Sequence, residues 1–259
     1  MTAVSISIKR SEPIELFRCG ARVVLIALPL LVLLPLHIVW HFLSLPSPWA
    51  MLFLRIAARV LGVRVKVHGK SLRKDVFFVA NHVSWIDIPI LAGINGTAFV
   101  AQDGVRSWPI IGWLATLNRT VFISRTDRQN VGDQVAELRA AIAENWSVTL
   151  FPEGTTSDGQ GLLPFKPALF ETLVPPPRPM LIQPVLLDFG DAGPEVGWLG
   201  VETGWESAWK AFTRKGNYKV HVHFLDPFDP VLCKDRKEIS ALARNRIAEA
   251  MAASRSVPA

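Results

Sequence analysis

Cysteine and charge are both scarce in this chain. Its 259 residues include only two cysteines, Cys19 and Cys233, which are far apart and lie in no partner motif. Neither a disulfide nor a metal site is expected from this count, and both thiols are predicted to be reduced. Charged residues make up 19% of the chain and apolar residues 50%, with a mean hydropathy of +0.28. The chain is more apolar than an ordinary soluble domain, so part of it should meet lipid.

Several familiar motifs are also missing. The sequence has no G-x-S-x-G nucleophile elbow and no evident cysteine nucleophile, which argues against a serine or cysteine hydrolase. It has no zinc-finger spacing and no RNA-binding aromatic signature, which argues against a nucleic-acid partner. A thioesterase that uses a histidine to activate water is excluded only weakly by these absences.

Positive charge is concentrated near the N-terminus. The net charge is +6, and the first 66 residues hold eight basic residues against two acidic ones, so the remainder is formally neutral. The basic residues are Lys9, Arg10, Arg18, Arg22, Arg55, Arg59, Arg64 and Lys66, and the acidic ones are Glu12 and Glu15. Basic flanks around an apolar segment are typical of a protein at a cytoplasmic membrane surface.

The apolar segment between these flanks predicts a membrane anchor. Every residue from Val23 to Leu36 is apolar or proline, and apolar residues resume from Ile38 to Leu43. A signal peptide is the alternative, but the run is longer than a usual signal-peptide core and no A-x-A-like cleavage site follows it. Pro29 and Pro35 are expected to interrupt the helix.

A turn at residues 44–48 and a second apolar piece, Trp49 to Leu54, suggest a hairpin. The basic flanks favour a re-entrant or monotopic hairpin with both ends on the cytoplasmic face of the inner membrane. A single tilted crossing is the alternative, because the first apolar run is long enough to span a bilayer.

Beyond residue 62, strand-like and helix-like pieces alternate. The expected strands are Val63–His68, Val76–Ala80, Thr97–Ala101, Thr120–Ser124, Ser147–Phe151, Met180–Phe189 and Lys219–Leu225. The expected helices are Trp85–Leu91, Trp108–Leu117, an amphipathic helix opened by a capping box at Thr126–Gln129, and a final helix opened at Asp235–Glu238. The alternation predicts an α/β domain at residues 63–259, with a mostly parallel central sheet flanked by helices, after an N-terminal hydrophobic helical anchor at residues 1–62.

A histidine and an aspartate follow the second expected strand. Asn81-His82 ends the apolar run, and Asp87 follows five residues after the histidine. Ser84-x-x-Asp87 is typical of a capping box, so His82 is expected in the strand-to-helix turn and Asp87 in the first helical turn, where they can meet. A carboxylate that accepts one ring N–H leaves the other nitrogen free to take a proton, which is general-base chemistry. The alternative is that Asp87 caps the helix and His82 is a hydrogen-bonded core residue.

A polar loop follows another expected strand. Phe151-Pro152-Glu153-Gly154-Thr155-Thr156-Ser157-Asp158-Gly159 begins where that strand ends. Polar groups at the carboxyl end of a strand lie where open α/β sheets bind ligands. Glycine allows close backbone approach, and hydroxyls with free loop amides can hold phosphate, hydroxyl or oxyanion groups. A simple polar turn is the alternative.

Taken together, four sequence blocks resemble the 1-acylglycerol-3-phosphate acyltransferase family, close to bacterial lyso-ornithine lipid acyltransferases. The blocks are Asn81-His82 with Asp87, Phe122-Ile123-Ser124-Arg125, Phe151-Pro152-Glu153-Gly154-Thr155, and Gln183-Pro184-Val185. The resemblance implies transfer of a fatty acyl group from an acyl carrier protein or coenzyme A thioester to the hydroxyl of a lysolipid of the 1-acyl-sn-glycerol-3-phosphate type. Lyso-ornithine lipid is the alternative acceptor, and a non-catalytic membrane lipid-binding protein is a more distant one.

The resemblance also implies residue roles. His82 would take the proton from the acceptor hydroxyl while Asp87 orients the ring, without a covalent acyl-enzyme, a metal or a further cofactor. The residues implied in acceptor binding are Arg125, Phe151, Pro152, Glu153, Gly154, Thr155, Thr156 and Lys166.

The chain departs from the family pattern at two positions. Thr156 stands where the family often has Arg, and Gln102 stands where it often has Lys. Each change removes a positive charge from the expected head-group region, which weakens the case for a phosphate-bearing acceptor.

Overall fold

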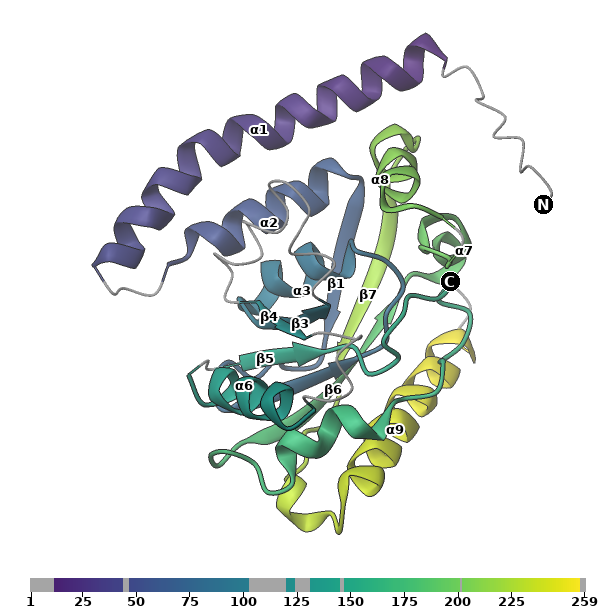
Figure 1. Cartoon of the computed structure of the whole chain (residues 1–259). Helices are drawn as coiled ribbons and strands as arrows, with labels where there is room; N and C mark the ends of the chain where they lie inside the picture. Colours follow the sequence, from purple (N-terminus) through teal and green to yellow (C-terminus); the bar gives the residue numbers. More distant parts are fainter. Residues whose placement is uncertain are drawn as a thin grey trace, which may run out of the picture.

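A seven-stranded sheet forms the centre of the described chain (Figure 1). The computed structural model describes residues 12–43, 47–102, 120–123, 131–144, 147–200 and 202–256. The strands are β1 (Val63–His68), β2 (Val76–Ala80), β3 (Ala98–Gln102), β4 (Val121–Ile123), β5 (Ser147–Leu150), β6 (Leu181–Asp188) and β7 (Tyr218–Phe224). Their order is β1-β7-β6-β2-β5-β3-β4, and only the β6–β7 pair of this sheet is antiparallel. The predicted fold class is confirmed.

Helices cover both faces of this sheet (Figure 1). Helices α2 (Trp49–Val60), α3 (Asp87–Asn95) and α8 (Gly204–Thr213) contribute to one apolar core, together with the short α7 (Gly193–Val196). Helices α6 (Val131–Glu144) and α9 (Arg236–Ser256) and the 3-10 segment η2 (Pro167–Leu173) contribute to the other. All five residues of β2 are buried. A strand covered on both faces needs a continuous apolar run, which is why VFFVA forms this central strand.

The final helix begins as the sequence predicts. The Asp235 carboxylate accepts the backbone N–H groups of Lys237 and Glu238 at 2.8 and 2.9 Å, so it caps α9. The predicted apolar stripe faces the core, with Ile239 and Ile247 fully buried. Two further 3-10 turns, η3 (Gly190–Ala192) and η4 (Pro230–Leu232), complete the described elements.

The N-terminal apolar segment is one helix, α1 (Pro13–Phe42), with Pro29 and Pro35 inside it. The prediction that these prolines interrupt the helix is therefore wrong. Each proline removes a single backbone donor from the helix, and the helix continues through both positions. By length and composition α1 is long and apolar enough to cross a membrane.

Helix α1 contacts the rest of the protein near both of its ends. Near its N-terminus, the buried Arg22 donates to the carbonyl oxygens of Ala211 and Phe212 in α8 at 2.9 and 3.1 Å. Near its C-terminus, the Trp40 ring meets Trp49 of α2 edge-on at 5.4 Å. Its outward face is apolar and exposed, and includes Phe17, Val24, Leu25, Leu28, Leu31, Val32 and Phe42. The helix therefore lies along the domain and presents an apolar surface to its surroundings (Figure 1).

The predicted division at residue 62 stays a prediction. Helix α2 ends two residues before that point, and its Ala57 and Ala58 are buried against the rest of the chain. The predicted helix Trp108–Leu117 and the capping box at Thr126–Gln129 lie outside the described residues.

Candidate active site

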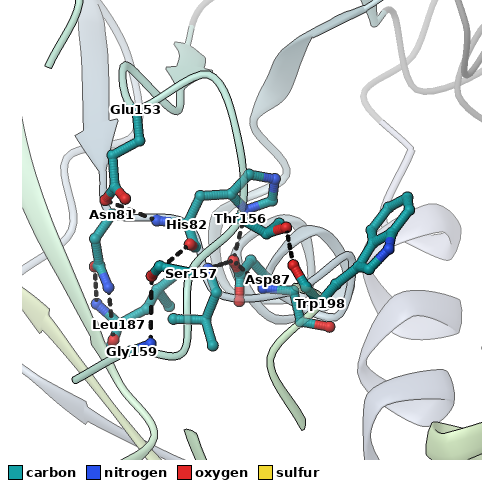
Figure 2. A network of polar contacts seen from close by, with 11 residues as sticks. Asn81, His82, Asp87, Glu153, Thr156, Ser157, Gly159, Leu187 and Trp198 are labelled. Atoms are coloured by element: carbon teal, nitrogen blue, oxygen red, sulfur yellow. Dashed lines mark hydrogen bonds and ion pairs between the residues drawn. The ribbon is translucent and has the colours of Figure 1, made fainter. Parts of the chain in front are cut away.

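The site begins where β2 leaves the sheet. Asn81, which is 1% exposed, exchanges two hydrogen bonds with the backbone of Leu187 (Figure 2). Its side-chain N–H donates to the Leu187 carbonyl at 3.0 Å, and its side-chain oxygen accepts the Leu187 N–H at 2.7 Å. The amide thus imitates one more residue of strand pairing with β6. This contact fixes the backbone that delivers His82.

The structure brings His82 and Asp87 together. His82 Nδ1 lies 2.7 Å from Asp87 Oδ2, and the same oxygen accepts the backbone N–H groups of Val83 and Ser84 at 2.7 and 3.1 Å. The predicted capping box is wrong, because Ile86 is the N-cap and Asp87 is the first residue of α3. From that position the carboxylate reaches back to the turn, and the buried Ser84 hydroxyl has no hydrogen-bond partner in the described part of the chain.

This contact fixes the tautomer of His82. An ionised carboxylate only accepts hydrogen bonds, so Nδ1 carries the hydrogen and Nε2 keeps a free lone pair. The His82 side chain is 19% exposed, whereas that of Asp87 is fully buried. The imidazole stacks on the Phe151 ring at 4.1 Å and 13°, which holds its plane. The pair is therefore arranged as a base whose working nitrogen is open to a substrate.

The second carboxylate oxygen of Asp87, Oδ1, is buried and makes no hydrogen bond to any described residue. Within the described part of the chain, Asp87 therefore holds the His82 ring and the turn through Oδ2 alone.

Glu153 supports the backbone of His82 from the polar loop. One carboxylate oxygen accepts the His82 N–H at 3.3 Å (Figure 2). The other accepts the Leu163 N–H at 3.4 Å. The residue is 2% exposed, and burial raises the pKa of Glu153 to about 7. Both carboxylate oxygens of Glu153 are thus used to hold backbone N–H groups of the protein itself.

Two residues that the sequence analysis did not assign to the site complete its frame. Ser157 donates its backbone N–H and its hydroxyl to the His82 carbonyl oxygen at 2.9 and 3.1 Å. The backbone N–H of Trp198 donates to the Val83 carbonyl oxygen at 3.0 Å. The backbone carbonyl oxygen of Trp198 accepts a hydrogen bond from the Thr156 hydroxyl. Ser157 belongs to the polar loop that marks the site, whereas no local signal singles out Trp198.

The remaining loop residues differ in accessibility. Phe151 and Pro152 are buried, and Thr155 is exposed. Gly154 has a φ of +66°, and a Cβ placed there would lie 2.5 Å from the Lys166 Nζ atom. Glycine thus permits both the left-handed turn and the close approach of an exposed ammonium group. Arg125 lies outside the described residues.

The fourth block has a structural position. The Gln183 side chain is buried and accepts the Leu72 N–H at 3.0 Å. It donates to the carbonyl oxygens of Lys70 and Leu225 at 2.9 and 3.0 Å. Gln183 therefore holds two chain segments against β6, away from the polar loop.

Comparison with known proteins identifies the family of this chain. Residues 64–188 match the protein family described as Acyltransferase. A lyso-ornithine lipid O-acyltransferase from Rhizobium meliloti (strain 1021) is 37% identical over 246 residues, which cover 88% of this chain and 83% of the relative. The chain belongs to the acyltransferase family.

Other proteins similar to this acyltransferase carry names of both acceptor types that the sequence analysis considered. A lyso-ornithine lipid O-acyltransferase from Brucella abortus (strain 2308) is 33% identical, with 80% of this chain and 84% of the relative covered. A 1-acyl-sn-glycerol-3-phosphate acyltransferase from Neisseria gonorrhoeae is 34% identical, with 46% of this chain and 47% of the relative covered. The crystal structure of the acyltransferase PlsC from Thermotoga maritima shares the fold, with a TM-score of 0.62, 22% identity, and 81% of this chain and 80% of that one covered.

Proposed function

We propose that this acyltransferase moves a fatty acyl group from a thioester to the free hydroxyl of a lysolipid, with His82 as the general base. The observation that carries the proposal is the 2.7 Å contact between His82 Nδ1 and the buried Asp87 carboxylate, which leaves Nε2 as an accessible base. The donor is an acyl carrier protein or coenzyme A thioester. Of the residues implied in acceptor binding, Thr155 and Lys166 are exposed beside the loop.

The reaction is a direct transfer. Nε2 of His82 takes the hydroxyl proton as the acceptor oxygen forms a bond to the thioester carbonyl carbon. The carbon–sulfur bond then breaks, the sulfur leaves as a thiolate, and the imidazolium returns the proton to that sulfur. The histidine is restored without a covalent intermediate on the protein. Asp87 holds the ring and stabilises its charged form between these two steps.

Lyso-ornithine lipid is the proposed acceptor. Relatives with this name cover most of the chain, whereas the Neisseria relative named for 1-acyl-sn-glycerol-3-phosphate covers less than half of it. Thr156 supports the same choice, because its hydroxyl donates to the Trp198 carbonyl and it brings no cation to the loop. Lysophosphatidate is the second candidate, since the exposed Lys166 ammonium beside Gly154 suits a phosphate.

A paired assay tests the acceptor. Purified enzyme is given lyso-ornithine lipid or lysophosphatidate, with acyl carrier protein and coenzyme A donors in parallel. The wild type should prefer lyso-ornithine lipid, and Thr156→Arg should raise the relative use of lysophosphatidate about tenfold, because a charge-assisted hydrogen bond contributes about 1.5 to 3 kcal/mol. Asn245→Arg adds the same charge at an exposed position on α9, and it is the control that should leave the acceptor preference unchanged. A wild type that prefers lysophosphatidate, with Thr156→Arg unchanged, would overturn this choice of acceptor.

We also infer that α1 binds the cytoplasmic leaflet of the inner membrane without crossing it. Arg22 contacts α8 and Trp40 contacts α2, so the N-terminal and C-terminal halves of α1 are both held against the domain. A helix held along a water-exposed domain cannot also span the bilayer, and its exposed apolar face suits an interfacial position. A reporter fused before Met1 should be cytoplasmic. A periplasmic reporter would instead indicate a single crossing.

A further inference from the structure

Three histidines that are far apart in the sequence meet on one edge of the sheet. His68 is the last residue of the edge strand β1, and His221 and His223 lie on the neighbouring strand β7. Strand register places His68 opposite His223, and Lys66 opposite His221. Because alternate residues of a strand point to the same face, His221 and His223 share one side of β7. The opposite side, with Val220 and Val222, is in the apolar core.

The three rings are close enough to act together. His68 Nε2 lies 2.9 Å from His221 Nδ1, and one ring nitrogen from each histidine lies within 4.8 Å of the others. The His68 ring stacks on His223 at 4.4 Å and on His221 at 5.0 Å. His223 Nε2 is buried and has no hydrogen-bond partner among the described residues. A buried nitrogen without a partner is costly, and a ligand would satisfy it.

Two of the three histidines have a lowered pKa. Burial and the neighbouring His221 and Lys66 lower the pKa of His68. Burial and the adjacent His68 lower the pKa of His223, although Asp188 acts in the opposite direction. Neutral imidazoles are the form that binds metal ions.

We propose that His68, His221 and His223 form a binding site for one divalent transition-metal ion of the zinc class. Three imidazole nitrogens are a ligand set that suits zinc, with a fourth position for water because all three side chains are partly exposed. No metal site was expected from the sequence, but that expectation rested on the number of cysteines and on the spacing of known motifs. Strand pairing, not a local motif, assembles it.

Coordination requires a small rearrangement. Zinc–nitrogen bonds of about 2.0 to 2.1 Å place tetrahedral ligand atoms roughly 3.3 Å apart, which falls within the range of separations in this cluster. The rings are nearly parallel, at 8° and 13°, whereas an ion lies in the plane of each ring that binds it. The imidazoles must therefore turn about their side-chain bonds, which partial exposure permits. A bound ion would join β1, which pairs only with β7 in the described sheet, more firmly to its neighbour.

Metal titration of the full-length protein tests this site. Protein in detergent micelles is treated with a chelator, and zinc is then added in a calorimeter and cobalt in a spectrophotometer. One ion should bind per chain, and cobalt should give the visible absorption of a nitrogen-ligated site. His68→Asn, His221→Asn and His223→Asn should each weaken binding at least about tenfold. His41→Asn on α1 and His82→Asn in the active site are matched controls and should keep full affinity.

A second measurement uses the wild type alone. Zinc should protect the three histidines from modification by diethyl pyrocarbonate, read by mass spectrometry, and should raise the melting temperature. Failure of zinc to bind or to protect these residues would overturn the proposal. Loss of binding in His82→Asn, with binding intact in the three cluster variants, would also overturn it. None of these readouts depends on acyl transfer, so failure of this site and failure of the proposed function are distinguishable.

Discussion

Asn81 extends the sheet by one residue through its side chain, because its amide exchanges two hydrogen bonds with the backbone of Leu187. The contact joins the end of β2 to β6 beside the base. This contact fixes the direction in which the backbone leaves the sheet at His82. Glu153 then accepts the His82 N–H, and the Ser157 hydroxyl donates to the His82 carbonyl oxygen. His82, the proposed base, is thus positioned by its main chain as well as by Asp87.

Replacement of Asn81 should therefore lower activity through the position of His82. Asn81→Asp keeps the acceptor for the Leu187 N–H but loses the donor to its carbonyl, and it buries a charge. We expect about 1 to 3 kcal/mol less unfolding free energy and a lower kcat. Denaturant unfolding and kinetics measure the two effects. Unchanged kcat in a folded Asn81→Ala protein would show that the contact does not position the base.

Substitution of the catalytic pair should separate the base from the residue that orients it. His82→Ala should reduce acyl transfer about 10² to 10⁴-fold, because a positioned base contributes that much. Asp87→Asn should cost less, since the ring remains, but it should change the pH profile of kcat. Circular dichroism and membrane flotation should be unchanged for His82→Ala. Most activity surviving in that variant would contradict the mechanism.

Glu153 should make stability depend on pH near neutrality. Burial raises its pKa from 4.5 to about 7, so between these values the folded protein keeps a proton that the unfolded chain has lost. Stability from this group is therefore present at low pH and falls as pH rises through the window, by at most about 3.5 kcal/mol at about 1.4 kcal/mol per pH unit.

Glu153→Gln removes this titration. The unfolding free energy of the variant relative to wild type should rise from pH 4.5 to 7, as measured by urea unfolding at several pH values. Glu144→Gln, at an exposed position on α6, is the control and should follow the wild type. Parallel pH curves for Glu153→Gln and the wild type would mean that the pKa of Glu153 is the same in the folded and the unfolded chain.

Arg22 should anchor α1 to α8. Its guanidinium donates to two carbonyl oxygens in the last turn of α8, where backbone acceptors lack helical partners. Arg22→Ala should lower stability by about 1 to 3 kcal/mol and increase hydrogen exchange in α8. Arg59→Ala removes an exposed arginine from α2 and is the matched control. Equal exchange in both variants would show that this contact does not hold the helix.

Local sequence patterns predicted the strands of the sheet and the turn that carries His82, but they did not predict α8 (Gly204–Thr213). A continuous apolar run must be covered on both faces, so Val76–Ala80 was predictable as a central strand. The carboxyl ends of parallel strands gather ligand-binding groups, so His82 and the loop after β5 were predictable as one site. The expectation that Pro29 and Pro35 interrupt α1 was wrong, because each proline removes only one backbone donor and the helix continues through both.

Only tertiary structure decided what each polar group of the site contacts. Whether Glu153 faces a substrate or the His82 backbone depends on how two loops pack, and no spacing within the loop encodes that. Trp198 enters the frame through chain segments brought together by β6 and β2, which lie far apart in the sequence. The three histidines follow the same rule, because His68 and His223 become neighbours only when β1 pairs with β7 in one register. Sequence determines which side chains follow each strand, and long-range strand pairing determines which of them meet.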